Sequence, residues 1–187
     1  MQSFITELPG VRVLEPRIFE DARGSFYESY NGARIREALK LPESVEFCQD
    51  NQSESRPGVL RGLHYQIRRP QGKLVRVLAG AIYDVAVDLR QGSPSFGRWI
   101  GRVLSAENRR MLWVPPGFGH GFLALDAGAT VLYKTTDYYF PEHERCVRWN
   151  APDLAIDWPL NGPPLLSPKD NRATFLSQAE TYAQIAA

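Results

Sequence analysis

The sequence predicts an all-β sandwich or barrel, and three observations point to it. Between residues 74 and 135, several short segments carry apolar side chains at alternate positions, as strands with one buried face do. Turn-forming stretches such as QGSPSFG, SAEN and PPGFG separate these segments at close, even spacing. Helical patterning is sparse. Many short strands at such spacing are typical of sandwiches and barrels.

The expected strands can be placed in chain order. Residues 74–89, LVRVLAGAIYDVAVDL, alternate on both sides of Gly80, so we expect two strands joined by a turn at this glycine. Further strands are expected in RWIGRVLS, RMLWVP, GFLAL and TVLYKTTDYYF, with DAGA as the turn between the last two. In the last strand, alternation puts Tyr133 on the same face as Val131, so Tyr133 points into the barrel if Val131 does.

Two short peripheral helices are expected. Asn31 is a suitable N-cap for the first, with Ile35 and Leu39 four residues apart on one face. Ser167 is a suitable cap for the second, with Pro168 at the first helical position.

The stretch WNAPDLAIDWPLNGPPLLSPKD is expected to be ordered but irregular, crossing over the barrel. Trp149, Leu154, Ile156 and Trp158 within it require burial, which argues against a loose tail. No repeat, low-complexity segment or linker divides the chain, so residues 1–187 are expected to form a single domain.

Composition and charge exclude several partners. The chain has 187 residues, with 22 Lys plus Arg against 21 Asp plus Glu, so no basic field predicts nucleic acid or a membrane surface. No apolar stretch approaches the ~20 residues of a spanning helix, and MQSFITELPGV does not have the pattern of a signal peptide. Cys48 and Cys146 are isolated, which fits a reducing cytosol, and we expect a cytoplasmic protein.

His64, in the stretch RGLHYQ, has three possible roles: a packed core histidine, a metal ligand or a catalytic base. Small β-sandwiches often bind metal through a His-x-His pair, a following glutamate and a later histidine in a Pro-x-Gly-x-x-His turn. Here PPGFGH supplies the later His120, but Gln66 replaces the second histidine and no glutamate follows soon. His143 lies in a charged PEHER loop. Two scattered imidazoles without a carboxylate partner make a poor zinc or iron site, so we expect no metal.

A base at His64 would need an orienting carboxylate. Imidazole titrates near neutral pH, and a base of this kind usually has a carboxylate on its other nitrogen. Asp84, Asp88 and Asp170 are candidates, and spacing does not choose among them. Local sequence favours a helix-cap role for Asp170, three residues after Ser167.

Lys73 and Tyr133 each have a structural and a chemical reading. Lys73 opens a strand in PQGKLVRV, where it is either a solvated strand-end lysine or a cation for a developing oxyanion. Tyr133 either packs in the core or donates a proton into a polar pocket. Tyr138 and Tyr139 are ordinary strand aromatics by default, although one could stack on a planar ring.

Several stretches follow one another in a family-specific order: FEDARGSFYESY, FCQDNQSES, GVLRGLHYQ, QGKLVRV, YDVAVDLR, SPSFGRW, LSAEN, WVPPGFGHGF, YKTTDYY and LSPKD. In this order and spacing, from about residue 3 to residue 175, the chain resembles the dTDP-4-dehydrorhamnose 3,5-epimerases of the cupin superfold. The resemblance implies a jelly-roll fold and a cofactor-free, metal-free isomerase. Its expected reaction converts dTDP-4-dehydro-6-deoxy-D-glucose to dTDP-4-dehydro-L-rhamnose, in dTDP-L-rhamnose biosynthesis.

The same resemblance implies roles for individual residues. His64 and Asp170 match a dyad that removes protons from the carbons beside the C4 ketone, so Asp170 is both cap and partner. Lys73 matches a lysine near the C4 oxygen, and Tyr133 matches a tyrosine that returns a proton from the opposite face. Inversion at carbon needs removal on one face and delivery on the other, so a second group opposite the base is expected.

A larger set of residues matches the family's substrate-binding positions: Arg23, Phe26, Glu28, Gln49, Asn51, Arg61, His120, Tyr139, Glu144 and Lys169. Arginine suits a diphosphate because its fork pairs with two oxygens. Tyr139 matches the aromatic that stacks on the thymine ring, and Phe26 is expected beside the nucleotide, although core packing is an equal alternative. The resemblance also implies a homodimer in which ARGSFYES contributes to the neighbour's site.

Three alternatives stay open. Relatives on this scaffold epimerise only C3 or only C5, so a mono-epimerase for another deoxysugar is the close rival. A cupin that binds a nucleotide sugar without turnover belongs to another class, and the joint presence of His64 and Tyr133 argues against it. A metal-dependent cupin is disfavoured by the missing His-x-His pair.

Overall fold

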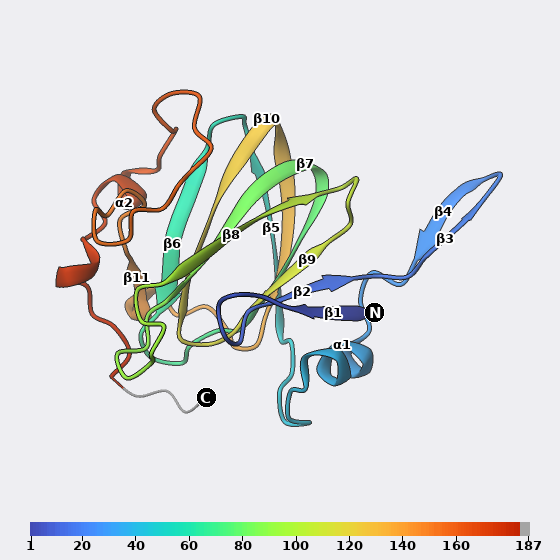
Figure 1. Ribbon diagram of the computed structural model, residues 1–187, viewed down its shortest axis with the longest axis horizontal. Coiled ribbons are helices and arrows are strands. Elements are labelled where there is room, and N and C mark those ends of the chain that lie inside the picture. Colours follow the sequence, from blue (N-terminus) through green and yellow to red (C-terminus); the bar gives the residue numbers. More distant parts are fainter. Residues whose placement is uncertain (184–187) are drawn as a thin grey trace.

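The protein is described by a computed structural model covering residues 1–183, in which antiparallel strands form the body (Figure 1). The strands are β1 (Gln2–Ile5), β2 (Arg12–Glu15), β3 (Ile18–Asp21), β4 (Gly24–Tyr27), β5 (Gln49–Ser55), β6 (Leu60–Gln66), β7 (Lys73–Asp88), β8 (Trp99–Ser105), β9 (Met111–Val114), β10 (Phe118–Thr135) and β11 (Glu144–Cys146). The helices are α1 (Gly32–Leu39) and α2 (Pro168–Asn171), with single 3-10 turns η1 (Pro141–His143) and η2 (Leu176–Gln178). The predicted all-β class with short peripheral helices is confirmed.

One nine-stranded sheet carries the fold, in the order β1-β2-β9-β7-β10-β6-β11, with β5 also paired to β10 and β8 to β7. The long strands β7 and β10 form its centre and pair from Lys73 opposite Thr135 to Asp88 opposite Phe118. The sheet is curved, as Figure 1 shows, and a cluster of buried apolar side chains forms its core. Val131 is buried in this core and Tyr133 packs against it, as alternation predicts.

Two expected turns are wrong, because β7 and β10 run through them without interruption. Gly80 has a φ of 71°, and a Cβ there would lie only 1.9 Å from the carbonyl oxygen of Gly128. The register of β7 and β10 shifts between Ala124 and Ala129, so both strands bend at the same place. A glycine within alternating residues marks a bulge or close backbone approach as readily as a hairpin turn. The bends let β7 pair with β9 before Gly80 and with β8 after it.

The other expected strands are confirmed as β8 and β9, while β1 to β6 and β11 were not among the strands placed from the sequence. Strands β3 and β4 pair only with each other, and most of their side chains are exposed, so they carry no alternating apolar signal. In Figure 1 this hairpin projects away from the body. Strand β5, QDNQSES, contains only polar residues and so has no apolar alternation. It forms a strand because it pairs with β10.

Both expected helices are confirmed with their caps. Asn31 accepts a hydrogen bond from the backbone N–H of Arg34 (3.2 Å), and Ile35 and Leu39 are buried against the sheet. At α2, the side chain of Ser167 accepts a hydrogen bond from the Asp170 N–H (3.1 Å). No helix among residues 1–183 is long and apolar enough to cross a membrane.

The irregular segment after β11 packs on the sheet, as expected. Leu154 and Trp158 are buried, and Trp149 and Ile156 are half-buried in the same apolar cluster. The Trp158 indole N–H donates to the Trp149 carbonyl at 2.9 Å. Short bridges pair Val59 with Leu165 and Val147 with Thr174. These contacts hold α2 against β6, which determines where Asp170 lies.

Candidate active site

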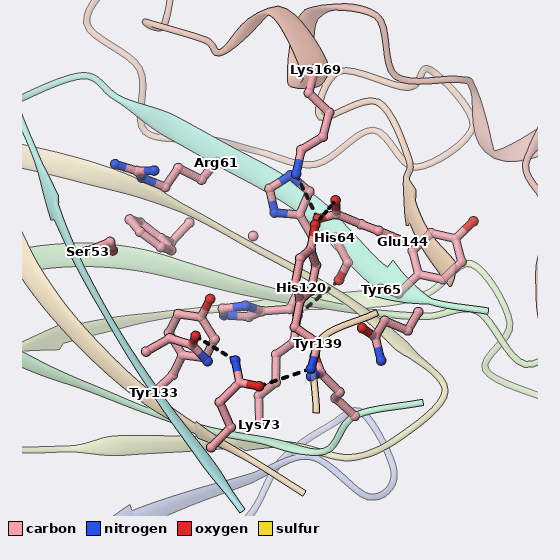
Figure 2. A pocket seen from close by; sticks show the side chains of 16 residues that line it. Ser53, Arg61, His64, Tyr65, Lys73, His120, Tyr133, Tyr139, Glu144 and Lys169 are labelled. Atoms are coloured by element: carbon pink, nitrogen blue, oxygen red, sulfur yellow. Dashed lines mark hydrogen bonds and ion pairs between the residues drawn. The ribbon is translucent and has the colours of Figure 1, made fainter. Parts of the chain in front are cut away.

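A polar pocket of about 340 Å³ lies between β5, β6, β7, β10 and the segment after β10 (Figure 2). Its lining residues are Gln49, Asn51, Ser53, Arg61, His64, Tyr65, Gln66, Gln71, Lys73, His120, Gly121, Phe122, Tyr133, Tyr139, Glu144 and Lys169. Most residues predicted for the site therefore meet in one cavity of the size that binds small molecules.

His64 and Asp170 form a close pair at this pocket. His64 Nε2 lies 2.5 Å from Asp170 Oδ1, although the two residues come from β6 and α2. Asp170 is buried and receives two further bonds: from Ser167 Oγ to Oδ2 at 2.7 Å and from the Gly62 N–H to Oδ1 at 3.4 Å. Asp170 is thus both part of the helix cap and the partner of His64.

Electrostatics hold this pair in a form suited to proton transfer. Burial lowers the pKa of His64, against the opposing pull of Asp170, so the imidazole is neutral at pH 7. Burial acts to raise the pKa of Asp170, but the bonds from His64, Ser167 and Gly62 lower it to about 2. A carboxylate on Nε2 favours the tautomer with its proton there, which leaves the Nδ1 lone pair free to accept a proton.

His120 also has a carboxylate partner, which the sequence argument against a metal site did not expect. His120 Nε2 lies 2.7 Å from Asp84 Oδ1, so His64 and His120 each have an aspartate. His120 is paired with His64 across β10 and β6, whereas Asp84 lies on β7. Strand pairing joins these residues across 36 positions of sequence, a distance at which local spacing carries no signal. His143 lies in η1 and does not line the pocket.

Lys73 is not a solvated lysine at the start of a strand, which was one of its two expected roles. It is buried at the pocket, and its ammonium donates to the His64 carbonyl at 3.2 Å. Burial lowers its pKa to about 8, although Glu144 and Asp84 act to raise it. At pH 7 it is therefore a mostly protonated cation in a buried position, where charges interact more strongly than in water.

Tyr133 faces the same cavity from β10. Burial raises the pKa of its phenol, so the hydroxyl is protonated at neutral pH. In Figure 2, Tyr133 lies across the pocket from His64, with His120 drawn between them. A neutral imidazole and a protonated phenol thus face one cavity from different strands.

The pocket mouth carries a network of charged and polar groups. Glu144 accepts from Lys169 Nζ at 2.7 Å and from the Tyr139 hydroxyl at 2.8 Å. Burial acts to raise the pKa of Glu144, and these two bonds lower it, so it is ionised. Gln49 accepts from the Tyr139 N–H at 3.0 Å, and Arg61 donates to Ser55 at 3.0 Å. Tyr139 lines the pocket and is exposed, so its bonds to Glu144 and Gln49 hold it at the outer edge of the cavity.

Arg23, Phe26 and Glu28 lie away from this pocket. Arg23 pairs with Asp21 in the projecting β3–β4 hairpin, and its side chain is 90% exposed. Phe26 is 71% exposed, and Glu28 bonds to Arg34 near the start of α1. None of the three lines the pocket of the described chain, residues 1–183.

Several lining residues were not predicted, among them Ser53 and Gln66. Gln66 donates to the Tyr138 carbonyl at 3.2 Å and accepts from the Phe140 N–H at 2.7 Å, so it holds the segment that carries Tyr139. Ser53 could have been found from the sequence. Gln49, Asn51 and Ser53 are alternate residues of β5, and alternate residues of a strand face the same side.

Comparison with known proteins decides the family. The sequence profile described as dTDP-4-dehydrorhamnose 3,5-epimerase matches residues 5–178. The chain belongs to this epimerase family. It is 57% identical over 175 residues to the dTDP-4-dehydrorhamnose 3,5-epimerase of Pseudomonas aeruginosa, covering 94% of this chain and 96% of that protein.

Solved structures of the epimerase family share its fold. A dTDP-6-deoxy-D-glucose-3,5-epimerase from Legionella pneumophila, in complex with dTDP-4-keto-L-rhamnose, has a TM-score of 0.94 at 48% identity, covering 99% of each chain. A 3'-monoepimerase from Streptomyces bikiniensis, in complex with dTDP-quinovose, has a TM-score of 0.84 at 37% identity, covering 95% of this chain and 88% of that one. The predicted cupin-type jelly roll and the prediction of an isomerase are thus confirmed.

Proposed function

We propose that this epimerase inverts C3 and C5 of dTDP-4-dehydro-6-deoxy-D-glucose to form dTDP-4-dehydro-L-rhamnose in dTDP-L-rhamnose biosynthesis. The observation that carries the proposal is the His64 imidazole, held by Asp170 at 2.5 Å, in a pocket that Lys73 and Tyr133 also line. The 3,5-epimerase names of the relatives from Pseudomonas aeruginosa and Legionella pneumophila support the choice of reaction.

In the first step His64 Nδ1 removes the proton from a carbon beside the C4 ketone. Asp170 stabilises the imidazolium that forms and keeps the ring in its productive orientation. The lost proton leaves an enolate, whose negative charge develops on the C4 oxygen. The Lys73 ammonium, buried at the pocket, is the cation that stabilises this charge.

In the second step Tyr133 delivers a proton to the opposite face of the same carbon. Its raised pKa keeps the phenol protonated until the enolate is ready to accept. The tyrosinate that results regains a proton from solvent, and His64 releases its proton in the same way. Repeating both steps at the second carbon completes the double inversion, with no redox cofactor required by the balance.

The nucleotide end of the substrate lies at the cationic mouth of the pocket. Arg61 and Lys169 are positioned to pair with diphosphate oxygens, and Tyr139, at the rim, presents an aromatic face for the base. Gln49 and Asn51 hydrogen-bond to each other at 2.8 Å beside it and supply further polar contacts.

The functional unit proposed here is a homodimer with shared sites. Arg23, Phe26 and Glu28 would reach the partner's pocket, since the hairpin carrying Arg23 and Phe26 projects from the body. The exposure of Phe26, at 71%, supports this arrangement because a large apolar side chain gains by burial in an interface. A cytoplasmic location stays a prediction from the isolated cysteines.

A mixing experiment tests the shared site. Arg23→Ala and His64→Asn homodimers are assayed alone at low substrate concentration, then mixed under subunit exchange. Sharing predicts recovered activity, since one site per heterodimer has His64 from one chain and Arg23 from the other. No recovery, with exchange verified by native mass spectrometry, would show that each hairpin does not serve its neighbour.

The reaction is tested by solvent exchange. The protein is incubated with dTDP-4-dehydro-6-deoxy-D-glucose in D₂O, and C3 and C5 are followed by NMR and mass. Deuterium with inversion at both carbons supports the double epimerase. The 3'-monoepimerase relative makes a single inversion the specific alternative, and deuterium at one carbon would establish it. With folded protein and no exchange at either carbon, the proposal fails and binding without turnover replaces it.

Tyr133→Phe is informative in the same assay. Removing only the hydroxyl should preserve deuterium exchange at the acidic carbons but abolish inversion, because the base remains and the opposite-face donor is lost. Inversion at the wild-type rate would exclude Tyr133 as the donor.

A further inference from the structure

Cys146 lies beside the His64–Asp170 pair and has no part in the proposed reaction. It is on β11, whose pairing with β6 places Cys146 directly opposite His64. Directly opposed residues of an antiparallel pair project from the same face of the sheet. Cys146 Sγ therefore lies 3.7 Å from Asp170 Oδ1, the atom that His64 Nε2 contacts at 2.5 Å. Ligand atoms of all three side chains lie within 4.8 Å of one another.

A thiol, an imidazole and a carboxylate are a donor set that zinc binds. With Zn–S of about 2.3 Å and Zn–N and Zn–O near 2.1 Å, tetrahedral ligand atoms are separated by about 3.4–3.7 Å. The sulfur–oxygen distance of 3.7 Å already meets this requirement. The His64–Asp170 contact of 2.5 Å must widen, and α2, a four-residue helix, is the element that would move.

The site borders the cavity and has room for a further ligand. His64 lines the pocket, and its side chain is 25% exposed, so its ring lies between the cavity and the proposed ion. Three protein ligands leave one tetrahedral position for solvent. The sequence does not indicate this set of ligands. Residues 64, 146 and 170 are far apart in the chain, and they do not follow the metal-binding pattern of cupins.

We propose that His64, Cys146 and Asp170 bind a thiophilic divalent cation such as Zn²⁺, and that the bound ion inhibits the enzyme. On binding, the Cys146 thiol releases its proton to solvent and the thiolate binds the ion. The ion takes the lone pair of His64 Nε2, so the single proton of the neutral ring resides on Nδ1. The pocket-facing nitrogen then carries an N–H in place of the lone pair that accepts the substrate proton.

The inhibition rests on the proposed role of His64 as the base, whereas the binding does not. Selectivity follows from the ligands. Mg²⁺ prefers an all-oxygen octahedral shell with several waters, which a site containing sulfur and nitrogen does not supply. Mg²⁺ is therefore expected to leave the site and the activity unchanged.

A spectroscopic titration tests binding independently of activity. Chelator-treated wild-type protein is titrated with Cd²⁺, whose thiolate complexes absorb in the ultraviolet by charge transfer. Cys48→Ser is the matched control, since Cys48 is the other free cysteine and is exposed. One equivalent should saturate the band in wild type and Cys48→Ser, with no band in Cys146→Ser or Cys146→Ala. A band that persists without Cys146, or no band in wild type, overturns the site.

Inhibition is then measured with Zn²⁺ on the same proteins. Both Cys146 variants should keep their activity without metal and require at least ~10-fold more Zn²⁺ for half-inhibition. Even substitutions of residues that only contact a metal ligand weaken metal affinity by about this factor. Equal inhibition of wild type and both variants refutes the inhibitory site. If the protein has no epimerase activity at all, the proposed function fails, while the Cd²⁺ titration still decides whether the metal site exists.

Discussion

His64 and His120 lie opposite each other on the paired strands β6 and β10, each bonded to an aspartate, and the two pairs differ mainly in what surrounds the carboxylate. Asp170 receives bonds from His64, Ser167 and the Gly62 backbone, and its histidine is 25% exposed at the pocket. Asp84 is fully buried, and within residues 1–183 its Oδ2 has no hydrogen-bond partner. Its histidine, His120, is only 7% exposed.

This difference shows that the same pair of residue types can serve two purposes. A carboxylate with its oxygens bonded and its histidine open to the cavity orients a base that meets substrate. A sealed carboxylate beside Lys73 and His120 acts by its charge, and it raises the pKa of Lys73 against the effect of burial. Substitutions of single residues can separate these two purposes.

The two histidines should respond very differently to removal of the imidazole. His64→Asn removes the proposed base and should lower kcat by ~10²–10⁴-fold, the usual contribution of a positioned acid–base group. His120→Asn should mainly raise KM, because His120 is expected to contact the substrate without accepting its proton. Steady-state kinetics on both variants, with Tm as the folding control, checks the contrast. An equal loss of kcat would mean that the bases have been assigned wrongly.

The two aspartates should differ in the same direction. Asp170→Asn keeps the shape of the side chain but removes the charge that stabilises the His64 imidazolium, so kcat should fall by ~10²-fold or more. Asp84→Asn should lower kcat by less than ~10-fold at pH 7, as expected for the loss of about 1 kcal/mol of interaction. A larger loss in Asp84→Asn than in Asp170→Asn would reverse the proposed division.

The pH dependence of kcat/KM should reflect the protonation of the Lys73 ammonium. The enolate needs a protonated lysine, so activity should fall as pH rises through about 8, the lowered pKa of Lys73. Asp84→Asn removes a negative charge that raises this pKa, and the alkaline limb should therefore move to lower pH. The measurement is a pH–rate profile of both proteins. A limb at the same pH in both would show that Asp84 does not act on Lys73.

Lys169→Ala should have the smallest effect. Its ammonium is half-exposed and pairs with Glu144, so it should bind the ground state and the transition state alike. KM should rise by up to ~5-fold with kcat unchanged, since an exposed ion contact contributes about 1 kcal/mol or less. A fall in kcat with constant KM would place Lys169 closer to the reacting carbons than proposed.

The fold class and the helices could be predicted from residue order alone, because strand alternation and helix caps are local signals. Asn31 and Ser167 cap helices within three residues of themselves, and Tyr133 follows Val131 into the core through a period of two. The sequence could not predict that β7 continues through Gly80, because a bend within a strand and a hairpin turn have the same local pattern.

The sequence by itself determined the chemical types at the site, and its family-specific motifs identified His64, Lys73, Tyr133 and Asp170 together. Only the tertiary structure decided that Asp84 meets His120 and that Cys146 joins the His64–Asp170 pair. The physical reason is that these contacts depend on strand register and on the packing of α2 against β6. They join residues 36 and 24 positions apart, beyond the reach of any local pattern.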